Sequence, residues 1–150
     1  MSSLFGAWDR EYTNNKYHRV LPSANIKFNM AENLVFRFAA SQTQTLPDYS
    51  ALGAASWGSD LNKTGGGGNP KLKPVLSTNF DAGLEWYFMP RGLLSATGYS
   101  MSMKDYVAYG VQTQMLFSEL THQLEAYQVA MPINADAAVT GVELNYLQPI

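Results

Sequence analysis

The stretch GNPKLKPVLSTNFDAGLEWYF, residues 68–88, decides the fold class. It opens with a Gly-Asn-Pro turn signal, and apolar and polar residues alternate strictly through its second half. The apolar positions end in two large aromatics, Trp86 and Phe88, whereas the opposite positions carry the carboxylates of Asp81 and Glu85. Successive side chains of a pleated strand point to opposite faces, so this period of two predicts a β-strand between an apolar medium and water. The apolar medium is either a soluble core or a lipid bilayer.

The composition is poor in charge for a soluble domain. Of the 150 residues, 15% are charged and 13% are aromatic, against about 25% charged in an ordinary soluble domain. The net charge of −2 and the lack of a basic run argue against nucleic acid as a partner. No apolar run is long enough for a transmembrane helix, and residues 1–17 do not have the pattern of a signal peptide.

The same alternation predicts four further strands, at residues 23–30, 34–41, 93–103 and 138–146. Tight turns at 31–33 and 89–92 alternate with long connections at 46–74 and 105–131. We predict that the first long connection is irregular, with the glycine run at 65–68 as a flexible loop tip. In the second, Leu116, Leu120 and Leu124 recur at helical spacing and are compatible with a short amphipathic helix. A continuation of the preceding strand is an equally good reading of its first half.

These features predict an all-β fold, an antiparallel up-and-down meander of about five strands. Both tight turns would lie at one end and both long connections at the other, as in outer-membrane barrels. The charged residues of the strands fall on the less apolar face of each strand: Lys27, Arg37, Asp81, Glu85, Lys104 and Glu143. A charge on a lipid face costs roughly 2–4 kcal/mol at the bilayer midplane, so this sorting suits a barrel wall with a wet lumen. A small soluble carbohydrate- or lipid-binding module would sort its charges in the same way and remains the alternative.

The motif GNPKLKPxxSxNxDxGxEWYF at residues 68–88 resembles a signature in the barrel of TonB-dependent outer-membrane receptors. Three neighbouring segments agree: VLPS at 20–23, GLLSA at 92–96 and GVEL at 141–144. The resemblance spans roughly residues 17–148 and implies an open segment of a 22-stranded transmembrane β-barrel. It also implies a parent in the outer membrane of a Gram-negative bacterium that takes up an iron chelate, an oligosaccharide or a similar scarce ligand. The implied partners are outer-membrane lipid, a plug domain, the remaining barrel strands and the TonB complex.

The sequence also departs from the family pattern. Leu46-Pro47-Asp48-Tyr49 stands where the family usually has an Arg-Pro segment, so the arginine is missing. Five strands are expected here against about 22, with neither a plug domain nor a C-terminal closing strand. We therefore expect residues 1–150 to be a partial receptor barrel, a piece of its later part.

No catalytic or metal-binding constellation is expected, and the protein is predicted not to be an enzyme and to need no cofactor. His18 and His122 are far apart in sequence, and each lacks an acidic or histidine partner at ligand spacing. Asp81 and Glu85 would lie about 13 Å apart along a strand, too far for a paired-carboxylate mechanism.

The remaining candidates are binding residues. Mobile loops offer aromatic and acidic side chains for a ligand: Tyr49, Trp57, Asp60, Tyr106, Tyr109 and Tyr127. Packing within the loops or anchoring at an interface is the alternative role for each. By the resemblance and the facing argument together, a second set would face the plug across the lumen: Lys27, Arg37, Asp81, Glu85 and Glu143. Trp86 and Phe88 are expected in an aromatic girdle at the lipid head groups.

Overall fold

The structure is a computed structural model that describes residues 14, 16–53 and 56–149. Contacts divide the chain into two compact units. The sheet unit comprises Val20–Pro47, Lys73–Ala108 and Ile133–Ile150. The loop unit comprises Asp48–Leu72 and Tyr109–Pro132, together with Met1–Arg19, of which only the described residues are considered. Each unit is described by itself.

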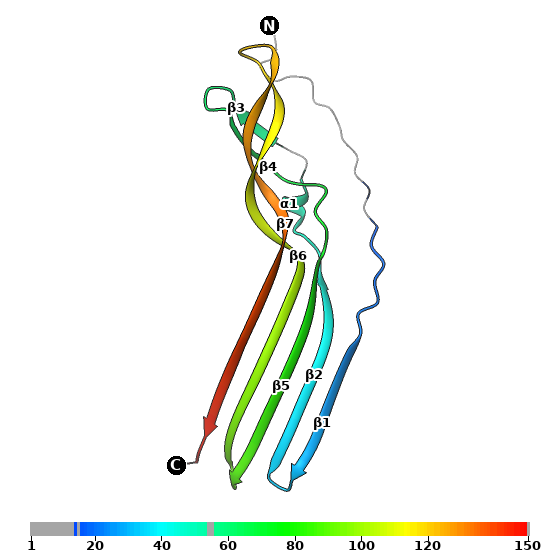
Figure 1. The fold of residues 1–150 in the computed structure, drawn as a ribbon, viewed down its shortest axis with the longest axis vertical. Helices are drawn as coiled ribbons and strands as arrows, with labels where there is room; N and C mark the ends of the chain where they lie inside the picture. The colour runs from blue at the N-terminus through cyan, green and yellow to red at the C-terminus, as the bar shows by residue number, and fades with distance from the viewer. Residues whose placement is uncertain (1–13, 15, 54–55, 150) are drawn as a thin grey trace. The chain divides into compact units, whose positions relative to one another are not determined.

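The sheet unit is an open antiparallel meander, as the alternation predicts (Figure 1). Its five strands are β1 (Ser23–Ala31), β2 (Leu34–Thr45), β5 (Val75–Met89), β6 (Gly92–Ser118) and β7 (Gln123–Leu147), and β6 and β7 continue into the loop unit. They are hydrogen-bonded in the order β1-β2-β5-β6-β7. The meander and its sequence order are therefore confirmed, although each strand is longer than the alternation alone indicates.

Two-residue turns close both predicted hairpins. Glu32-Asn33 joins β1 to β2, and Pro90-Arg91 joins β5 to β6. Arg91 has a φ of 65°, the left-handed conformation that such a turn requires. The backbone N–H of Tyr87 donates to the carbonyl of Asn33 at 2.8 Å, so the ends of the two hairpins are tied together.

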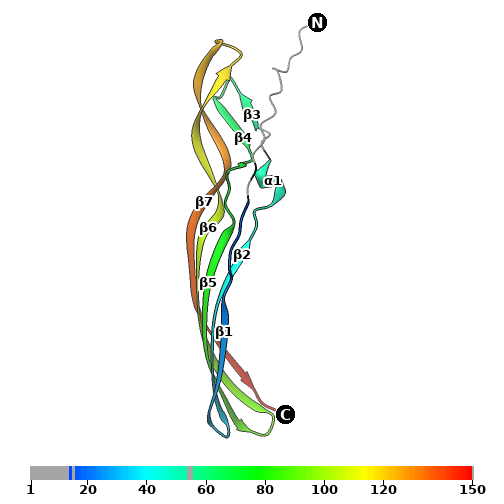
Figure 2. The ribbon, with the colours of Figure 1, turned by 90° about the vertical axis from the view of Figure 1, so that its right-hand side faces the viewer.

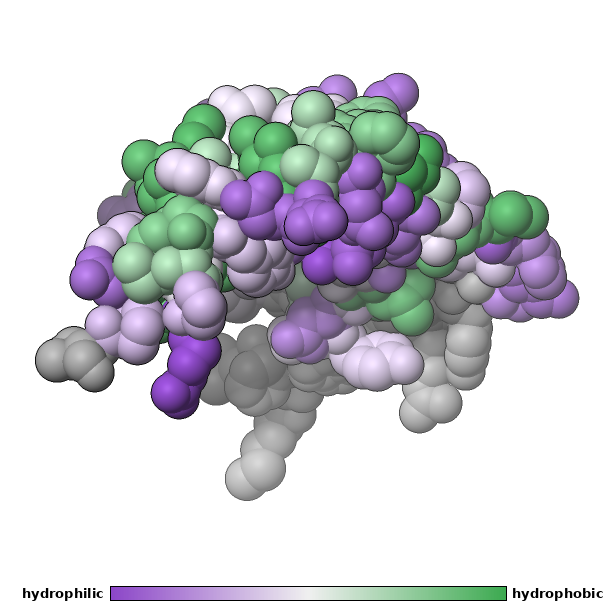
Figure 3. Space-filling model, turned by 90° about the horizontal axis from the view of Figure 1, so that it is seen from below, coloured by the Kyte–Doolittle hydropathy of each residue, from purple (hydrophilic) through white to green (hydrophobic). Residues whose placement is uncertain are grey.

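The strand register separates an apolar face from a polar face. Ile26 lies opposite Phe38, and Phe36 lies opposite Leu84, whereas Lys27 lies opposite Arg37. Figure 2 shows the strands of this unit in a single layer, and Figure 3 shows apolar residues gathered along one side. The two-faced strand pattern is therefore a property of the whole sheet.

The apolar face has no second layer packed against it in the part of the chain that the structure describes. The residues that a soluble sheet would bury remain open: Ile26 is 58% exposed, Phe80 48%, Leu84 42% and Leu144 78%. A compact, self-sealed core would bring these side chains below about one tenth exposure. The soluble alternative therefore lacks the core it needs.

The first long connection contains secondary structure, contrary to the prediction of an irregular loop. It forms α1 (Tyr49–Leu52), β3 (Ser56–Ser59) and β4 (Thr64–Gly67). The carboxylate of Asp48 accepts the N–H of Ser50 at 3.0 Å and caps α1. The described residues therefore form seven strands, where the sequence predicts about five.

The glycine run is a strand and not a loop tip, so that prediction is wrong. β4 pairs antiparallel with β3 and, unexpectedly, parallel with β7 through Thr64–Gln128, Gly65–Val129 and Gly66–Ala130. A Cβ on Gly66 would lie 2.9 Å from the indole of Trp57, its cross-strand partner. A Cβ on Gly65 would lie 2.6 Å from the backbone carbonyl oxygen of Trp57, so glycine is required at that position by close packing and not by flexibility.

The helix predicted in the second long connection is also wrong, whereas the alternative, a continuing strand, is confirmed. Leu116 lies in β6, Leu120 in the turn 119–122 and Leu124 in β7. The N–H of His122 donates to the carbonyl of Ser118 at 2.9 Å and closes this turn. Residues 106–117 contain no charge or proline and many aromatic or branched side chains, a composition that favours strand over helix.

The loop unit has a small core of its own. Along β7, Tyr127, Val129 and Met131 are buried, while the residues between them are exposed. Leu72 and Ala51 are buried as well. This core holds together the part of the loop unit from which the candidate ligand residues project.

Candidate functional site

The polar face of the sheet unit carries a charged groove of about 320 Å³. Four of the five residues predicted to face a plug line it: Lys27, Arg37, Asp81 and Glu85. Arg37 Nε donates to Glu85 Oε1 at 2.7 Å, and the hydroxyl of Tyr87 donates to Glu85 Oε2 at 2.9 Å. The sequence-predicted set is therefore brought together from three strands, with Arg37 and Glu85 already paired.

Glu143 shares this face without lining the groove. The ring of Tyr99 lies so close to Gly141 that a Cβ there would be 2.4 Å from it. Gly141 therefore faces the same side as Tyr99 and its register partner Asp81. Glu143 follows two residues along β7 and points the same way.

Lys104 does not belong to the charged face, which corrects its sequence assignment. Its register partner on β5 is Leu76, which lies four residues before Phe80 and therefore on the same face, so Lys104 stands on the apolar face. The error arises because β6 has two faces of weak contrast, and only pairing with β5 tells them apart.

A second groove of about 500 Å³ lies on the polar face over β2, β5 and β6. Tyr106 is the one predicted loop aromatic that lines it. Its floor is a hydroxyl and amide array: Ser77 Oγ donates to Asn79 Oδ1 at 2.7 Å, and Asn79 Nδ2 lies 3.4 Å from Ser41 Oγ and from Thr43 Oγ1. The prediction missed this array, although strict alternation already placed Asn79 on the polar face.

Asn134 fixes the backbone that presents Tyr106. Its Oδ1 accepts the N–H of Lys73 at 2.9 Å, and its Nδ2 donates to the carbonyls of Lys73 at 3.2 Å and Asp105 at 2.7 Å. Asp105 has a φ of 57° and interrupts the regular alternation of β6. Because of this irregularity, Tyr106 lines the polar-face groove together with Met103.

The loop unit exposes some of the predicted ligand residues and buries another. Tyr49 is 87% exposed, Tyr109 82% and Trp57 67%. Tyr127 is 1% exposed and belongs to the core, so it is not available to a ligand. Tyr49, Trp57 and Tyr109 are thus surface aromatics, whereas Tyr127, which looks the same in the sequence, is a packing residue.

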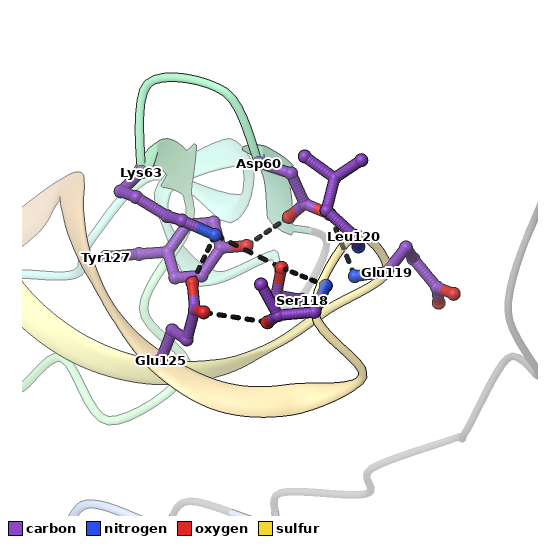
Figure 4. Close-up of polar contacts among 8 residues, drawn as sticks. Asp60, Lys63, Ser118, Glu119, Leu120, Glu125 and Tyr127 are labelled. Carbon is purple, nitrogen blue, oxygen red and sulfur yellow. Dashed lines mark hydrogen bonds and ion pairs between the residues drawn. The ribbon is translucent and has the colours of Figure 1, made fainter.

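Asp60 is engaged within the loop unit (Figure 4). Its carboxylate accepts hydrogen bonds from the hydroxyl of Tyr127, from Glu119 N at 2.8 Å and from Leu120 N at 3.2 Å. The hydrogen bond from Tyr127, followed by those from the two backbone amides, lowers the pKa of Asp60 below its ordinary value.

Lys63 makes a second polar connection beside it (Figure 4). Its ammonium pairs with Glu125, lies 3.1 Å from Ser118 Oγ and sits 5.1 Å from the centre of the Tyr127 ring. The ion pair raises the pKa of Lys63 and lowers that of Glu125. We call Asp60, Lys63, Glu125 and Tyr127 the polar lock. No local sequence pattern signals it, because Asp60 and Lys63 are separated from Glu125 and Tyr127 by 62 residues or more.

No metal site is evident in the described residues, which hold no group of three or more metal-ligating His, Asp or Glu side chains. Nor does any helix in the described ranges have the length and apolarity to cross a membrane.

Comparison with known proteins places these surfaces in context. A family model described as "TonB dependent receptor-like, beta-barrel" matches residues 3–148. The crystal structure of the siderophore receptor PirA from Pseudomonas aeruginosa is similar over 87% of this chain and 25% of that chain, with a TM-score of 0.65 and 17% identity. PirA from Acinetobacter baumannii matches 84% of this chain and 20% of that chain, with a TM-score of 0.62 and 17% identity. No curated protein sequence matches. The chain thus spans a quarter or less of these two receptors, and the likeness shows the fold.

Proposed function

Since the chain belongs to the β-barrel family of TonB-dependent receptors, we propose that it forms part of the wall of an outer-membrane receptor for a scarce ligand. The ligand would be an iron chelate, an oligosaccharide or a similar molecule. The names of the two similar structures, both siderophore receptors, support the first of these classes. Its role is transport and not catalysis. The observation that carries the proposal is the open sheet with one exposed apolar face and one charged face.

The apolar face has the features of a lipid contact. Close to the two short turns, Trp86 and Phe88 lie 5.7 Å apart between ring centres, and Phe88 stacks on Tyr146 at 5.9 Å. Gly92 lets the Phe88 ring pass over β6, because a Cβ there would lie 3.0 Å from that ring. Aromatic side chains of this kind form girdles at the lipid head groups of outer-membrane barrels.

Strand length supports the orientation. A tilted transmembrane strand needs about 9–11 residues, whereas β6 has 27 and β7 has 25. The excess residues must leave the hydrocarbon layer, and in barrels of this kind the long connections face the cell exterior. We therefore assign the short turns to the periplasmic side and the loop unit to the extracellular side.

The polar face would turn to the lumen and to a plug domain of the parent receptor. Arg37 and Glu85 satisfy each other, whereas Lys27 and Asp81 have no ion-pair partner among the described residues. Lys27 also stands directly opposite Arg37, and the one carboxylate of Glu85, which pairs with Arg37 and also interacts with the charge of Lys27, offsets these two cations only in part. Lys27 and Asp81, with Glu143, are thus the groups best placed to pair with a plug, and Arg37 and Glu85 brace the wall.

The residues proposed to meet ligand outside the cell are Tyr49, Trp57 and Tyr109, with Asp60 reachable only if its present hydrogen bonds open. Tyr106 would meet ligand on the polar face, where it lines the second groove. In the parent receptor, residues 1–150 would form one part of the barrel and the parent chain would provide the remaining strands. The TonB complex would be its energy-coupling partner.

Quenching of tryptophan fluorescence by brominated lipid tests the membrane role. Two double variants of the full chain, each with one tryptophan left, are reconstituted in lipid: Trp8→Phe/Trp57→Phe keeps Trp86, and Trp8→Phe/Trp86→Phe keeps Trp57. We expect strong quenching of Trp86 and little of Trp57. A chain that is a monodisperse monomer without detergent, melts cooperatively and shows no lipid quenching would instead be the soluble module.

A further inference from the structure

We propose that the second groove on the polar face binds an uncharged, hydroxyl-rich molecule, an oligosaccharide, in preference to an anionic iron chelate. The inference rests on the proposed receptor function and narrows its ligand class. It follows from the side chains that line this groove, from their hydrogen bonds and from the placement of the nearby cations.

The lining is rich in hydroxyl groups and lacks cations. Its twelve residues include four serines and threonines of the polar face, two tyrosines, one asparagine, three apolar residues and a single charged group, Asp81; the twelfth, Ser100, is the register partner of Phe80. None of the twelve is lysine, arginine or histidine. Anionic chelates are held by charge-assisted bonds from such cations, and Asp81 would repel them. A neutral ligand meets no such penalty.

The hydroxyl and amide array can still donate hydrogen bonds to a ligand. Asn79 Nδ2 approaches Ser41 Oγ and Thr43 Oγ1 only at 3.4 Å, longer than a strong N–H···O bond. Its Oδ1, by contrast, is held by Ser77 at 2.7 Å, which fixes the amide plane. The amide hydrogens are therefore oriented but weakly engaged, so sugar hydroxyls could accept them at little cost.

Two phenol rings border the array. The Tyr99 ring is held against Gly141 in β7, and Tyr106 is presented by the irregularity at Asp105 that Asn134 anchors. Tyrosine combines a flat apolar face with a polar tip. Such a pair suits a ligand with apolar ring faces and hydroxyl edges.

Four cations of the sheet unit lie outside the lining of this groove. Lys27 and Arg37 line the other groove, where Arg37 is paired with Glu85. Lys104 stands on the apolar face, and the Lys73 ammonium lies 4.0 Å from Asp105. None of these contributes a positive charge to the lining of the second groove.

Calorimetric titration of the full chain in lauryldimethylamine oxide micelles tests the proposal, with maltoheptaose as the neutral probe and ferric citrate as the anionic probe. We expect saturable binding of maltoheptaose and none of ferric citrate. Asn79→Ala and Tyr106→Ala should each weaken maltoheptaose binding by roughly 3- to 10-fold, whereas Tyr146→Phe, on the apolar face, should leave it unchanged. Circular dichroism confirms that each variant keeps its strands.

A designed gain of function sharpens the test. Thr43→Arg places a guanidinium in the groove, so it should weaken maltoheptaose and allow ferric citrate to bind. Binding of ferric citrate by the unaltered chain, or failure of maltoheptaose to bind, overturns the ligand class. The lipid quenching of Trp86 would still be observed in that case, so failure of the ligand class is distinguishable from failure of the receptor proposal.

Discussion

Arg37 on β2 donates to Glu85 on β5 at 2.7 Å, a contact between residues 48 positions apart in the chain. The side chains are 49% and 22% exposed. Tyr87 donates to the second oxygen of the same carboxylate at 2.9 Å, so Glu85 is held from both sides. The pair is a brace across two neighbouring strands, on the face that carries the other charges.

A double-mutant cycle measures this brace. Because both side chains are partly open to water, Arg37→Ala and Glu85→Ala should show a coupling free energy of about 0.2–1 kcal/mol in urea unfolding of the micelle-bound chain. The same cycle on Lys27 and Asp81, which form no ion pair, should give no coupling. A coupling of several kcal/mol for Arg37 and Glu85 would mean that the pair is dry and would contradict a wetted face.

Loss of the Tyr127 hydroxyl should loosen the polar lock without emptying the core. Tyr127→Phe keeps the buried ring and removes one hydrogen bond to Asp60, at a cost of about 1 kcal/mol. Hydrogen exchange should then accelerate at the backbone amides of Glu119 and Leu120, which also bond to Asp60. Tyr109→Phe is the control, because Tyr109 is 82% exposed and should leave these amides unchanged. Equal acceleration in both variants would show that the lock does not hold the hairpin end.

The polar lock should open in acid. Asp60 and Glu125 have lowered pKa values, so their contribution is present above their unfolded pKa values and is lost as the pH falls through the folded ones. The window therefore lies below about pH 4. The contribution of Lys63, whose pKa is raised, is complete below its unfolded pKa and is lost only as the pH rises through the folded one, in strongly alkaline solution.

The backbone amide of Gln128 reports this opening. It donates to the carbonyl of Lys63 at 2.8 Å, so its exchange protection should fall at acid pH beyond the intrinsic pH dependence of exchange. Asp60→Asn removes one titrating group and should flatten part of that fall. Unchanged acid sensitivity in both Asp60→Asn and Glu125→Gln would place its origin outside the lock.

The features that sequence predicted well are those set by neighbours in the chain. Alternation placed Asp81 and Glu85 on one face and Trp86 and Phe88 on the other, because a strand enforces a period of two. The turn at Pro90-Arg91 is also predictable from its own residues, because proline favours turn positions. The charged groove follows from this facing together with strand order.

The features that sequence missed depend on distant partners. The alternation within residues 93–104 predicts the polar face for Lys104, but pairing with Leu76 puts it on the apolar face. Asp60 had the sequence signal of an open loop carboxylate, yet Tyr127, 67 residues away, holds it. The leucine spacing in residues 116–124 suggested a helix because a helical repeat can straddle a hairpin turn by coincidence. The parallel pairing of β4 with β7 likewise has no local signature.

Gly66→Ala should disturb the hairpin of β3 and β4. The added Cβ would lie 2.9 Å from Cε2 and Nε1 of Trp57, closer than side-chain contacts allow. The indole, which is 67% exposed, must therefore swing away from its cross-strand position, and we expect a loss of about 0.2–1 kcal/mol, typical of a cross-strand contact. Trp57 emission in the variant without Trp8 and Trp86 should change as the ring leaves its contact with β4.

Gly98→Ala is the matched control for this substitution. A Cβ at Gly98 meets no atom within 4 Å, and alanine lowers the backbone entropy of the unfolded chain. Its effect on the free energy of unfolding should therefore be neutral or slightly stabilising, with Trp57 emission unchanged. If Gly66→Ala were equally neutral, the contact between the Trp57 indole and β4 would not be what requires glycine there.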